Sequence, residues 1–249
     1  MLFRSWVPLM QMTVKIGKSS YRVDLKAPCD ISIPVSFDKK QLSAFGGPPA
    51  RREAYKAGDF VGDVRHGGSC NCEVYTFSPH LNGTHTECVG HITKKRIAVH
   101  DITTESLIPA ILITVTPKEY LITAAMLKKL KGEFLDALII RTLPNGKNKT
   151  QRNYSKIPPP YFTAEAMRYI VRLGVRHLLV DFPSVDKNDD KELVNHRIFW
   201  AKNPLKKTIT ELVYAPDKVR DGHYLLNLQV AAFDADAAPS RPVLYKVRQ

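Results

Sequence analysis

One short segment, residues 80–91 (HLNGTHTECVGH), holds the side chains best suited to chemistry. It contains three histidines and a carboxylate, which are ligand types that bind zinc or manganese. His85 and Glu87 are two residues apart, so they face the same side of an extended segment, and Gly83 would let the backbone turn after His80. This spacing predicts a metal site. The alternative is a polar loop whose histidines only hydrogen-bond to backbone groups.

Hydrophobic patterning predicts mainly β-strands in the first part of the chain. Residues 44–68 are rich in Gly, Pro and charged side chains, which indicates a long loop or a mobile arm. The predicted strands are a hairpin formed by 13–16 and 21–25, then 31–37, 71–77 and the apolar run 108–115. Pro34 would confine its strand to a sheet edge or a bulge. Such a β-rich beginning argues against a simple doubly wound sheet.

Helices and strands alternate in the rest of the chain. Thr116 at an N-cap, with Glu119 three residues later, predicts a helix over residues 116–131. Thr163 caps a second predicted helix, which ends near Gly174. The remaining predictions are a helix over 191–201 and strands over 137–142, 175–181, 208–213, 224–233 and 243–247.

The whole chain has the composition of a globular protein. Its 249 residues are 44% hydrophobic and 24% charged, which excludes a disordered or fibrous polypeptide and suits one domain over residues 1–249. No apolar run reaches the roughly 18 residues that a membrane span needs. The first residues lack a signal-peptide pattern, so we expect a cytoplasmic protein with no membrane contact.

The net charge of +13 does not by itself predict nucleic-acid binding. The basic residues are scattered in short groups, and aromatic residues do not interleave with them as in a stacking platform. We therefore interpret the excess as a basic surface and expect no nucleic-acid partner. The four cysteines lack the Cys-x₂-Cys spacing of a structural zinc site, which favours reduced thiols.

Residues 83–87 and His91 resemble the motif His-x-Gly-Thr-His-x-Asp-x-Pro-x-His of the metal-dependent cyclase family, whose members include bacterial kynurenine formamidases and isatin hydrolases. This chain departs from the motif at two ligand positions. The family's first histidine falls at Leu81, with His80 one residue further away, and the family's Asp is Glu87. Other family landmarks follow in the expected order, at residues 30–34 (DISIP), 140–142 (IRT), 181–186 (DFPSVD), 196–197 (HR), 211–212 (EL) and 239–243 (PSRPV).

The resemblance implies an α/β fold with a β-rich, barrel-like or layered core and external helices, similar to the swivelling β/β/α fold of that family. It also implies a divalent metal ion, zinc or manganese, bound by side chains that are far apart in the sequence. The implied metal ligands are His80, His85, Glu87, His196 and Glu211. His91 occupies the family's acid/base position. His80 would need a one-residue bulge to reach the metal.

The activity that the resemblance implies is hydrolysis of a carbon–nitrogen amide bond, or of a cyclic lactam or ester bond, in a small metabolite through a metal-activated water. The alternative is a non-catalytic member that binds a small metabolite, which the departures at Leu81 and Glu87 would support. Family members commonly form homodimers or homotetramers, and the arm at 44–68 could cover a neighbour's site. The aromatic candidates for lining a substrate pocket are Phe60, Tyr75 and Trp200.

Other polar residues receive structural interpretations. Ser184 and Asp186 lie in a proline-containing turn, so we interpret them as turn formers. The histidines outside the family landmarks are also interpreted as structural, and these are His66, His100, His177 and His223.

Overall fold

The computed structural model describes residues 10–249, and residues 1–9, where no signal peptide was expected, lie outside the described part. The strands are β1 (Gln11–Ile16), β2 (Ser19–Asp30), β3 (Arg51–Ala54), β4 (Lys56–Ala57), β5 (Phe60–Val61), β6 (Glu73–Thr76), β7 (His85–Glu87), β8 (Ile108–Val115), β9 (Leu121–Ile122), β10 (Ala137–Thr142), β11 (Tyr161–Phe162), β12 (His177–Val180), β13 (Thr208–Glu211), β14 (Gly222–Val230) and β15 (Ala237–Arg248). The helices are α1 (Pro79–Asn82), α2 (Ala124–Leu127), α3 (Ala164–Arg172) and α4 (Val194–Trp200), with 3₁₀ turns η1 (Val64–His66), η2 (Val89–Ile92), η3 (Val99–Asp101), η4 (Lys147–Gln151) and η5 (Pro204–Lys206).

A closed β-barrel forms the centre of the fold. Its strands follow the order β15, β14, β8, β10, β12, β13 and β7, and the start of β15 pairs with β7 to close the ring. The strands from β8 to β13 in this order run parallel, whereas β14, β15 and β7 are antiparallel to their neighbours. Closure leaves no free sheet edge in the ring. The expected barrel-like α/β core is confirmed.

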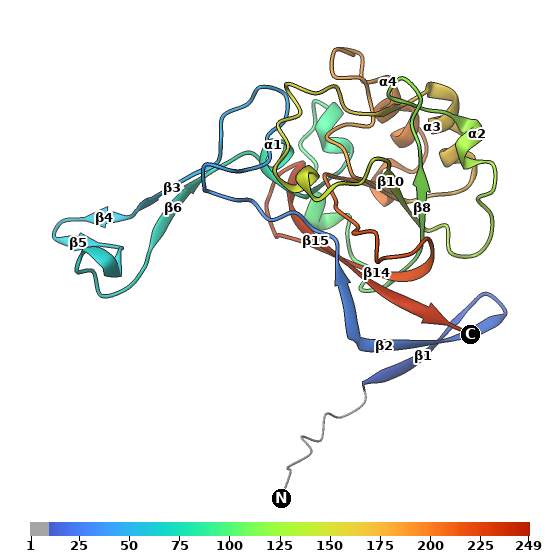
Figure 1. Ribbon diagram of the computed structural model, residues 1–249, viewed down its shortest axis with the longest axis horizontal. Helices are drawn as coiled ribbons and strands as arrows, with labels where there is room; N and C mark the ends of the chain where they lie inside the picture. The colour runs from blue at the N-terminus through green and yellow to red at the C-terminus, as the bar shows by residue number, and fades with distance from the viewer. Residues whose placement is uncertain (1–9) are drawn as a thin grey trace, which may run out of the picture.

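Both faces of the central strands are buried. Along β10, Ala137 and Ile139 belong to one hydrophobic cluster, whereas Leu138 and Ile140 belong to a second cluster that includes Met167 of α3. Successive strand residues point to opposite faces, so burial of both faces favours the continuous apolar run at residues 137–140. Figure 1 shows α2, α3 and α4 gathered on one side of the barrel, where they cover the second face.

Several predicted elements are confirmed. Strands β8 and β10 have the predicted bounds, and β1 and β2 form the predicted hairpin. The Thr163 hydroxyl accepts a hydrogen bond from the Ala166 N–H and so caps α3, and Gly174 follows that helix at a left-handed φ of +83°. Local signals were sufficient in these segments because burial and capping favour the same structure.

The prediction of a helix over residues 116–131 is wrong. Lys118 and Leu121 exchange backbone hydrogen bonds, and the turn between them places Glu119 and Tyr120 at φ values of +48° and +67°. A right-handed helix cannot pass through these conformations. Within this range the helix is limited to α2, which follows β9 in the chain, and β9 pairs with β11.

The prediction of a strand over residues 31–37 is also wrong. The Ser32 N–H and hydroxyl both bind the Asp30 carboxylate, which turns the chain at the end of β2. The segment continues as extended chain without a strand ladder, since Pro34 has no N–H to donate. Ile33 still donates its N–H to the Thr84 hydroxyl at 2.7 Å, so this segment packs against the residue that precedes β7.

Residues 51–76 form a β-ribbon that projects from the barrel, and we call it the arm. Its two sides are β3 and β6, which pair antiparallel, and β4 and β5 pair near its tip. Figure 1 shows the arm extending away from the body of the protein. The predicted loop or arm at 44–68 therefore contains paired strands.

Candidate metal centre

Strand β7 lies at the centre of the site and aligns its functional residues with those of β13. Its antiparallel register places His85 opposite Glu211, while Glu87 lies two residues along the same strand. Helix α1 precedes β7 and carries His80, the turn η2 follows it and carries His91, and α4 contributes His196. The structure thus brings together all six residues that the sequence indicated, which we call the cluster: His80, His85, Glu87, His91, His196 and Glu211.

His80 reaches the cluster without a bulge in a strand. It lies on the single turn of α1, and its ring centroid is 4.5 Å from that of His91 and 5.1 Å from that of His85. The helical turn accommodates the extra residue between His80 and the Gly-Thr-His sequence. Gly83 is extended, with φ at 177°, and a Cβ there would meet the Ile33 carbonyl oxygen at 3.0 Å. Glycine is therefore needed for close packing, and not for the turn that was expected.

His85 has one ring nitrogen satisfied and the other without a partner. Its Nδ1 lies 3.1 Å from the Gly83 carbonyl oxygen, which can only accept, so Nδ1 carries the proton. Its Nε2 is buried, makes no hydrogen bond within the described residues and lies 3.4 Å from Glu211 Oε2. Buried polar atoms are rarely left unpaired in proteins, and an unprotonated nitrogen in this position suits a metal ion.

His196 is held in the same manner by Asp186. Its Nδ1 lies 2.6 Å from Asp186 Oδ2, and its Nε2 lies 3.0 Å from Glu87 Oε1. Asp186 also accepts the backbone N–H groups of Asn195 and His196, so it fixes the start of α4. The turn interpretation of Asp186 holds, since its N–H binds the Ser184 hydroxyl, but it missed the contact with His196. The available signal was the Asp at the end of the 181–186 landmark.

Asp236 holds two further histidines and was also missed. Its Oδ2 lies 3.1 Å from His80 Nε2 and 3.2 Å from His91 Nδ1, while His80 Nδ1 lies 3.3 Å from Glu87 Oε2. Asp236 belongs to none of the landmarks recognised in the sequence. Its only signal was its place three residues before Pro239, where the closing landmark begins.

The cluster fits a divalent cation. The ligand atoms of His80, His85 and Glu87 lie within 4.8 Å of one another, and so do those of Glu87, His91 and His196. His80, His85 and His196 each have one nitrogen held by an outer oxygen and the other directed at a cluster carboxylate. Outer acceptors of this kind fix the tautomer of metal-binding histidines.

The cluster side chains shift one another's pKa values. Burial opposes protonation of His80 and His196, but hydrogen bonds and nearby carboxylates raise the pKa of each to about 10. Burial also opposes ionisation of Glu87, but the two imidazoles hold its pKa well below the usual range. Burial and the neighbouring Glu87 carboxylate raise the pKa of Glu211. A divalent cation could replace these protons, so its binding would release them.

An aromatic pocket of about 370 Å³ lies beside the cluster. Its wall consists of Tyr75, Thr76, Phe77, Pro79, Phe233, Ala235 and Ala237, and His80 and Asp236 complete the lining. Of the aromatic candidates, Tyr75 lines this pocket, whereas Trp200 packs behind His196 at 5.5 Å between ring centroids and Phe60 packs beside Tyr55 on the arm.

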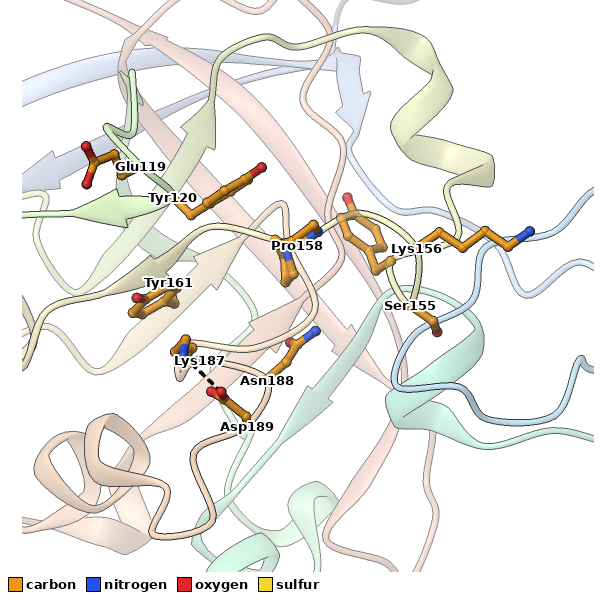
Figure 2. Close-up of a pocket in the computed structure, with 11 residues that line it drawn as sticks. Glu119, Tyr120, Ser155, Lys156, Pro158, Tyr161, Lys187, Asn188 and Asp189 are labelled. Carbon is orange, nitrogen blue, oxygen red and sulfur yellow. Dashed lines mark hydrogen bonds and ion pairs between the residues drawn. The ribbon is translucent and has the colours of Figure 1, made fainter.

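Another pocket, of about 540 Å³, lies apart from the cluster side chains. Figure 2 shows the Lys187–Asp189 ion pair with Tyr120 and Tyr161 around it. None of the six cluster residues lines this pocket.

The histidines interpreted as structural lie outside the cluster. His66 contacts Asp63 on the arm, and the Nδ1 of His100 contacts the backbone oxygen of Phe233. The other two have buried or stacked partners: His177 binds the Thr208 hydroxyl and His223 stacks on Phe134.

Comparison with known proteins identifies related sequences and folds. A protein-family model described as "Putative cyclase" matches residues 23–187. Kynurenine formamidase from Bacillus cytotoxicus is 31% identical over 182 residues, covering 71% of this chain and 81% of that protein. The Bacillus anthracis kynurenine formamidase is 34% identical over the same coverage.

Solved structures show the same fold at low sequence identity. Isatin hydrolase A from Labrenzia aggregata superposes with a TM-score of 0.62 at 14% identity, covering 88% of this chain and 93% of that one. Isatin hydrolase A from Ralstonia solanacearum gives a TM-score of 0.64 at 14% identity, with 88% and 91% coverage.

Proposed function

Since this chain belongs to the cyclase family, we propose that it is a metal-dependent hydrolase that cleaves a carbon–nitrogen amide bond, or a cyclic lactam or ester bond, of a small metabolite. The observation that carries the proposal is the set of inward-facing imidazole nitrogens around Glu87 and Glu211. The departures at Leu81 and Glu87 do not disperse the ligands, because α1 places His80 3.3 Å from Glu87. This geometry supports an enzyme over a non-catalytic binding protein.

The proposed ligands of the ion are His80, His85, Glu87, His196 and Glu211. A mixed set of imidazoles and carboxylates suits zinc and manganese alike. When bound, such an ion supplies Lewis acidity, which polarises a carbonyl group and makes water more acidic. The protein contributes a buried, preoriented ligand set: the side chains of His85, Glu87 and His196 are at most 3% exposed.

His91 is the proposed proton carrier. Its side chain is 29% exposed, in contrast to the fully buried His85, so it can contact both substrate and solvent. Its Nδ1 is held by Asp236, which leaves Nε2 for proton transfer. His91 would accept a proton from the attacking water and deliver it to the departing nitrogen.

The proposed substrate carries an aromatic ring. Tyr75, Phe77 and Phe233 form an apolar wall beside His80, which suits a flat ring with its reactive carbonyl directed at the cluster. The names of the related proteins, kynurenine formamidase and isatin hydrolase, support aryl formamides and cyclic aryl lactams as the classes to test first.

A cytoplasmic location and a homo-oligomeric state complete the proposal. Cys29, Cys70, Cys72 and Cys88 are all free thiols, as expected in a reducing compartment. Among residues 10–249, no helix has the length and apolarity required to cross a bilayer. The projecting arm offers a surface for a second copy of the chain.

The experiment combines metal analysis with a substrate screen. Protein purified without added metal is analysed by mass spectrometry and then assayed with aryl formamides and aryl lactams. We expect stoichiometric zinc or manganese together with hydrolysis of at least one class. His85→Ala should remove both metal and activity while the fold is retained. His66→Ala, which removes an exposed histidine of the arm, should change neither.

Retention of a full metal complement by His85→Ala would contradict the assigned site. Wild-type protein that binds the metal but cleaves no compound of either class would contradict the proposed substrates. Failure of the wild-type protein to bind zinc or manganese would contradict the proposed metal dependence.

A further inference from the structure

Asp236 uses one oxygen to contact two histidines that have different proposed roles. Oδ2 is 3.1 Å from Nε2 of His80, a proposed ligand, and 3.2 Å from Nδ1 of His91, the proposed proton carrier. The two rings lie side by side, with centroids 4.5 Å apart. Neither the family motif nor any landmark in the sequence includes Asp236.

The backbone around Asp236 is hydrogen-bonded to β7 and the residue that follows it, and β7 carries the proposed ligands His85 and Glu87. Its carbonyl oxygen accepts the Cys88 N–H at 3.0 Å, and the next residue, Ala237, pairs with Glu87 in the β15–β7 ladder. Gly90 permits this approach, because a Cβ there would lie 2.4 Å from the Ile97 carbonyl oxygen and 3.1 Å from Asp236 Cβ. These contacts with the β7 region hold the backbone of Asp236, and so its carboxylate, in place beside the two histidines.

The chemistry of a carboxylate determines the state of both rings. Asp236 Oδ2 lies within hydrogen-bond distance of a ring nitrogen of each histidine, and a carboxylate oxygen accepts hydrogen bonds from such nitrogens. His80 Nε2 and His91 Nδ1 must then be the donors. With a cation bound, His80 would keep only that proton, so its Nδ1 would face the cation on the Glu87 side, and Nε2 of His91 would remain available to exchange protons with substrate.

We propose that Asp236 is a positioning residue that sets the ring orientation and tautomer of His80 and His91 together. Its position links metal binding to proton transfer, because one side chain orients both a proposed metal ligand, His80, and the proposed proton carrier, His91. The proposal rests on the function proposed above for the roles of the two histidines.

Asp236→Asn tests the proposal, since it keeps the size of the side chain and removes its charge. Asp234→Asn is the matched control, because it neutralises an exposed carboxylate on the same loop. We expect Asp236→Asn to bind Zn²⁺ about 10–100-fold more weakly, the usual cost of losing an outer hydrogen-bond partner. At saturating Zn²⁺, kcat should fall while KM changes little, because His91 is misoriented and the aromatic wall is intact. The control should resemble the wild type in both respects.

Proton NMR of the metal-free protein supplies a readout that needs neither metal nor substrate. The downfield imidazole N–H resonances of His80 and His91 should be present in the wild type and in Asp234→Asn, and should move upfield in Asp236→Asn, because a neutral amide oxygen is a weaker acceptor than a carboxylate. Asp236→Glu retains the carboxylate charge and should recover part of the Zn²⁺ affinity lost in Asp236→Asn. A purely structural role predicts a lower melting temperature with none of these effects.

Wild-type Zn²⁺ affinity and wild-type kcat in Asp236→Asn would overturn the proposal. A loss of one bound Zn²⁺ per chain, with the remaining Zn²⁺ held at normal affinity, would also overturn it, because Asp236 would then be a ligand. If the proposed function is wrong, the wild-type protein itself will bind no metal or hydrolyse no amide. The NMR comparison needs neither metal nor substrate, so it still tests the hydrogen bonds of Asp236.

Discussion

Glu87 contacts two histidines of the cluster, one with each of its carboxylate oxygens. Oε1 lies 3.0 Å from His196 Nε2, and Oε2 lies 3.3 Å from His80 Nδ1. The resemblance to the cyclase motif predicted an acidic side chain here, with Asp as the family residue. The structure gives a reason for the longer side chain, because His80 is displaced by one residue onto α1 and the carboxylate must span both rings.

Replacing Glu87 by Asp should weaken the site even though it restores the family residue. Removing one methylene group withdraws the carboxylate from at least one of its two imidazole partners. We expect the affinity for Zn²⁺ or Mn²⁺ to fall, as measured by competition with a chelator. Glu165→Asp, at an exposed position on α3, is the control and should bind metal like the wild type. Tighter metal binding by Glu87→Asp would contradict this account.

His91 should behave differently from the ligands when it is removed. His91→Ala is expected to retain nearly normal metal content, while turnover falls by roughly 10²–10⁴-fold, the usual contribution of a general acid/base. Metal content, melting temperature and kcat are to be measured on one preparation, with His85→Ala as the ligand variant for comparison. Loss of metal from a folded His91→Ala protein would assign His91 to the ligands.

The sequence identified the residues of the cluster but not the groups that orient them. His80, His85, Glu87 and His91 could be found because they are neighbours in one segment, and the family resemblance added His196 and Glu211. Asp236 has a side chain of an ordinary type in a polar loop, and only the pairing of β15 with β7 brings it to the histidines. Side chains that act through tertiary contacts leave little local pattern.

At the scale of elements, Thr84 joins three separate segments next to the site. Its hydroxyl accepts the Ile33 N–H at 2.7 Å and donates to the Leu212 carbonyl oxygen at 2.5 Å. Leu212 follows Glu211 directly and has a left-handed φ of +59°, which is uncommon for this residue type. The contact with Thr84 therefore helps to hold the chain just beyond a proposed ligand.

Thr84→Val should destabilise the protein and weaken its metal site. The change leaves the buried Ile33 N–H and Leu212 carbonyl without their partner, at a cost of about 1–3 kcal/mol for each unpaired group. Thr84→Ser keeps the hydroxyl and should remain close to the wild type. Urea unfolding of the metal-free proteins measures the difference. Equal midpoints for Thr84→Val and Thr84→Ser would show that the hydroxyl contributes no stability.

Prediction of the elements succeeded where one physical cause determined the structure. The apolar runs of β8 and β10 are buried on both faces, and α3 has both its cap and its terminal glycine. Residues 116–131 carried equally good helix signals, but the pairing of β9 with β11 requires a tight turn at that point. A local capping pattern cannot report such a long-range pairing.

At the scale of the whole molecule, the arm extends away from the body formed by the rest of residues 10–249 (Figure 1). A two-stranded ribbon alone is marginally stable in water, and this one exposes apolar side chains. Tyr55, Val64 and Val74 are 46%, 54% and 43% exposed. Its strand β6 also carries Tyr75, which lines the aromatic pocket beside the cluster. A second copy packed on the arm would cover these side chains and lie next to the pocket.

We therefore expect the protein to be a homo-oligomer held together in part by the arm. Light scattering after gel filtration should give at least twice the 28.1 kDa mass of one chain. Replacing Tyr55, Val64 and Val74 together by Ser should shift the protein to monomers, since the cost of exposing these side chains would no longer favour association. Val194→Ser, which removes an exposed apolar side chain from the body, should leave the mass unchanged. A monomeric wild type, or an oligomer that survives the triple change, would show that the arm does not hold copies of this chain together.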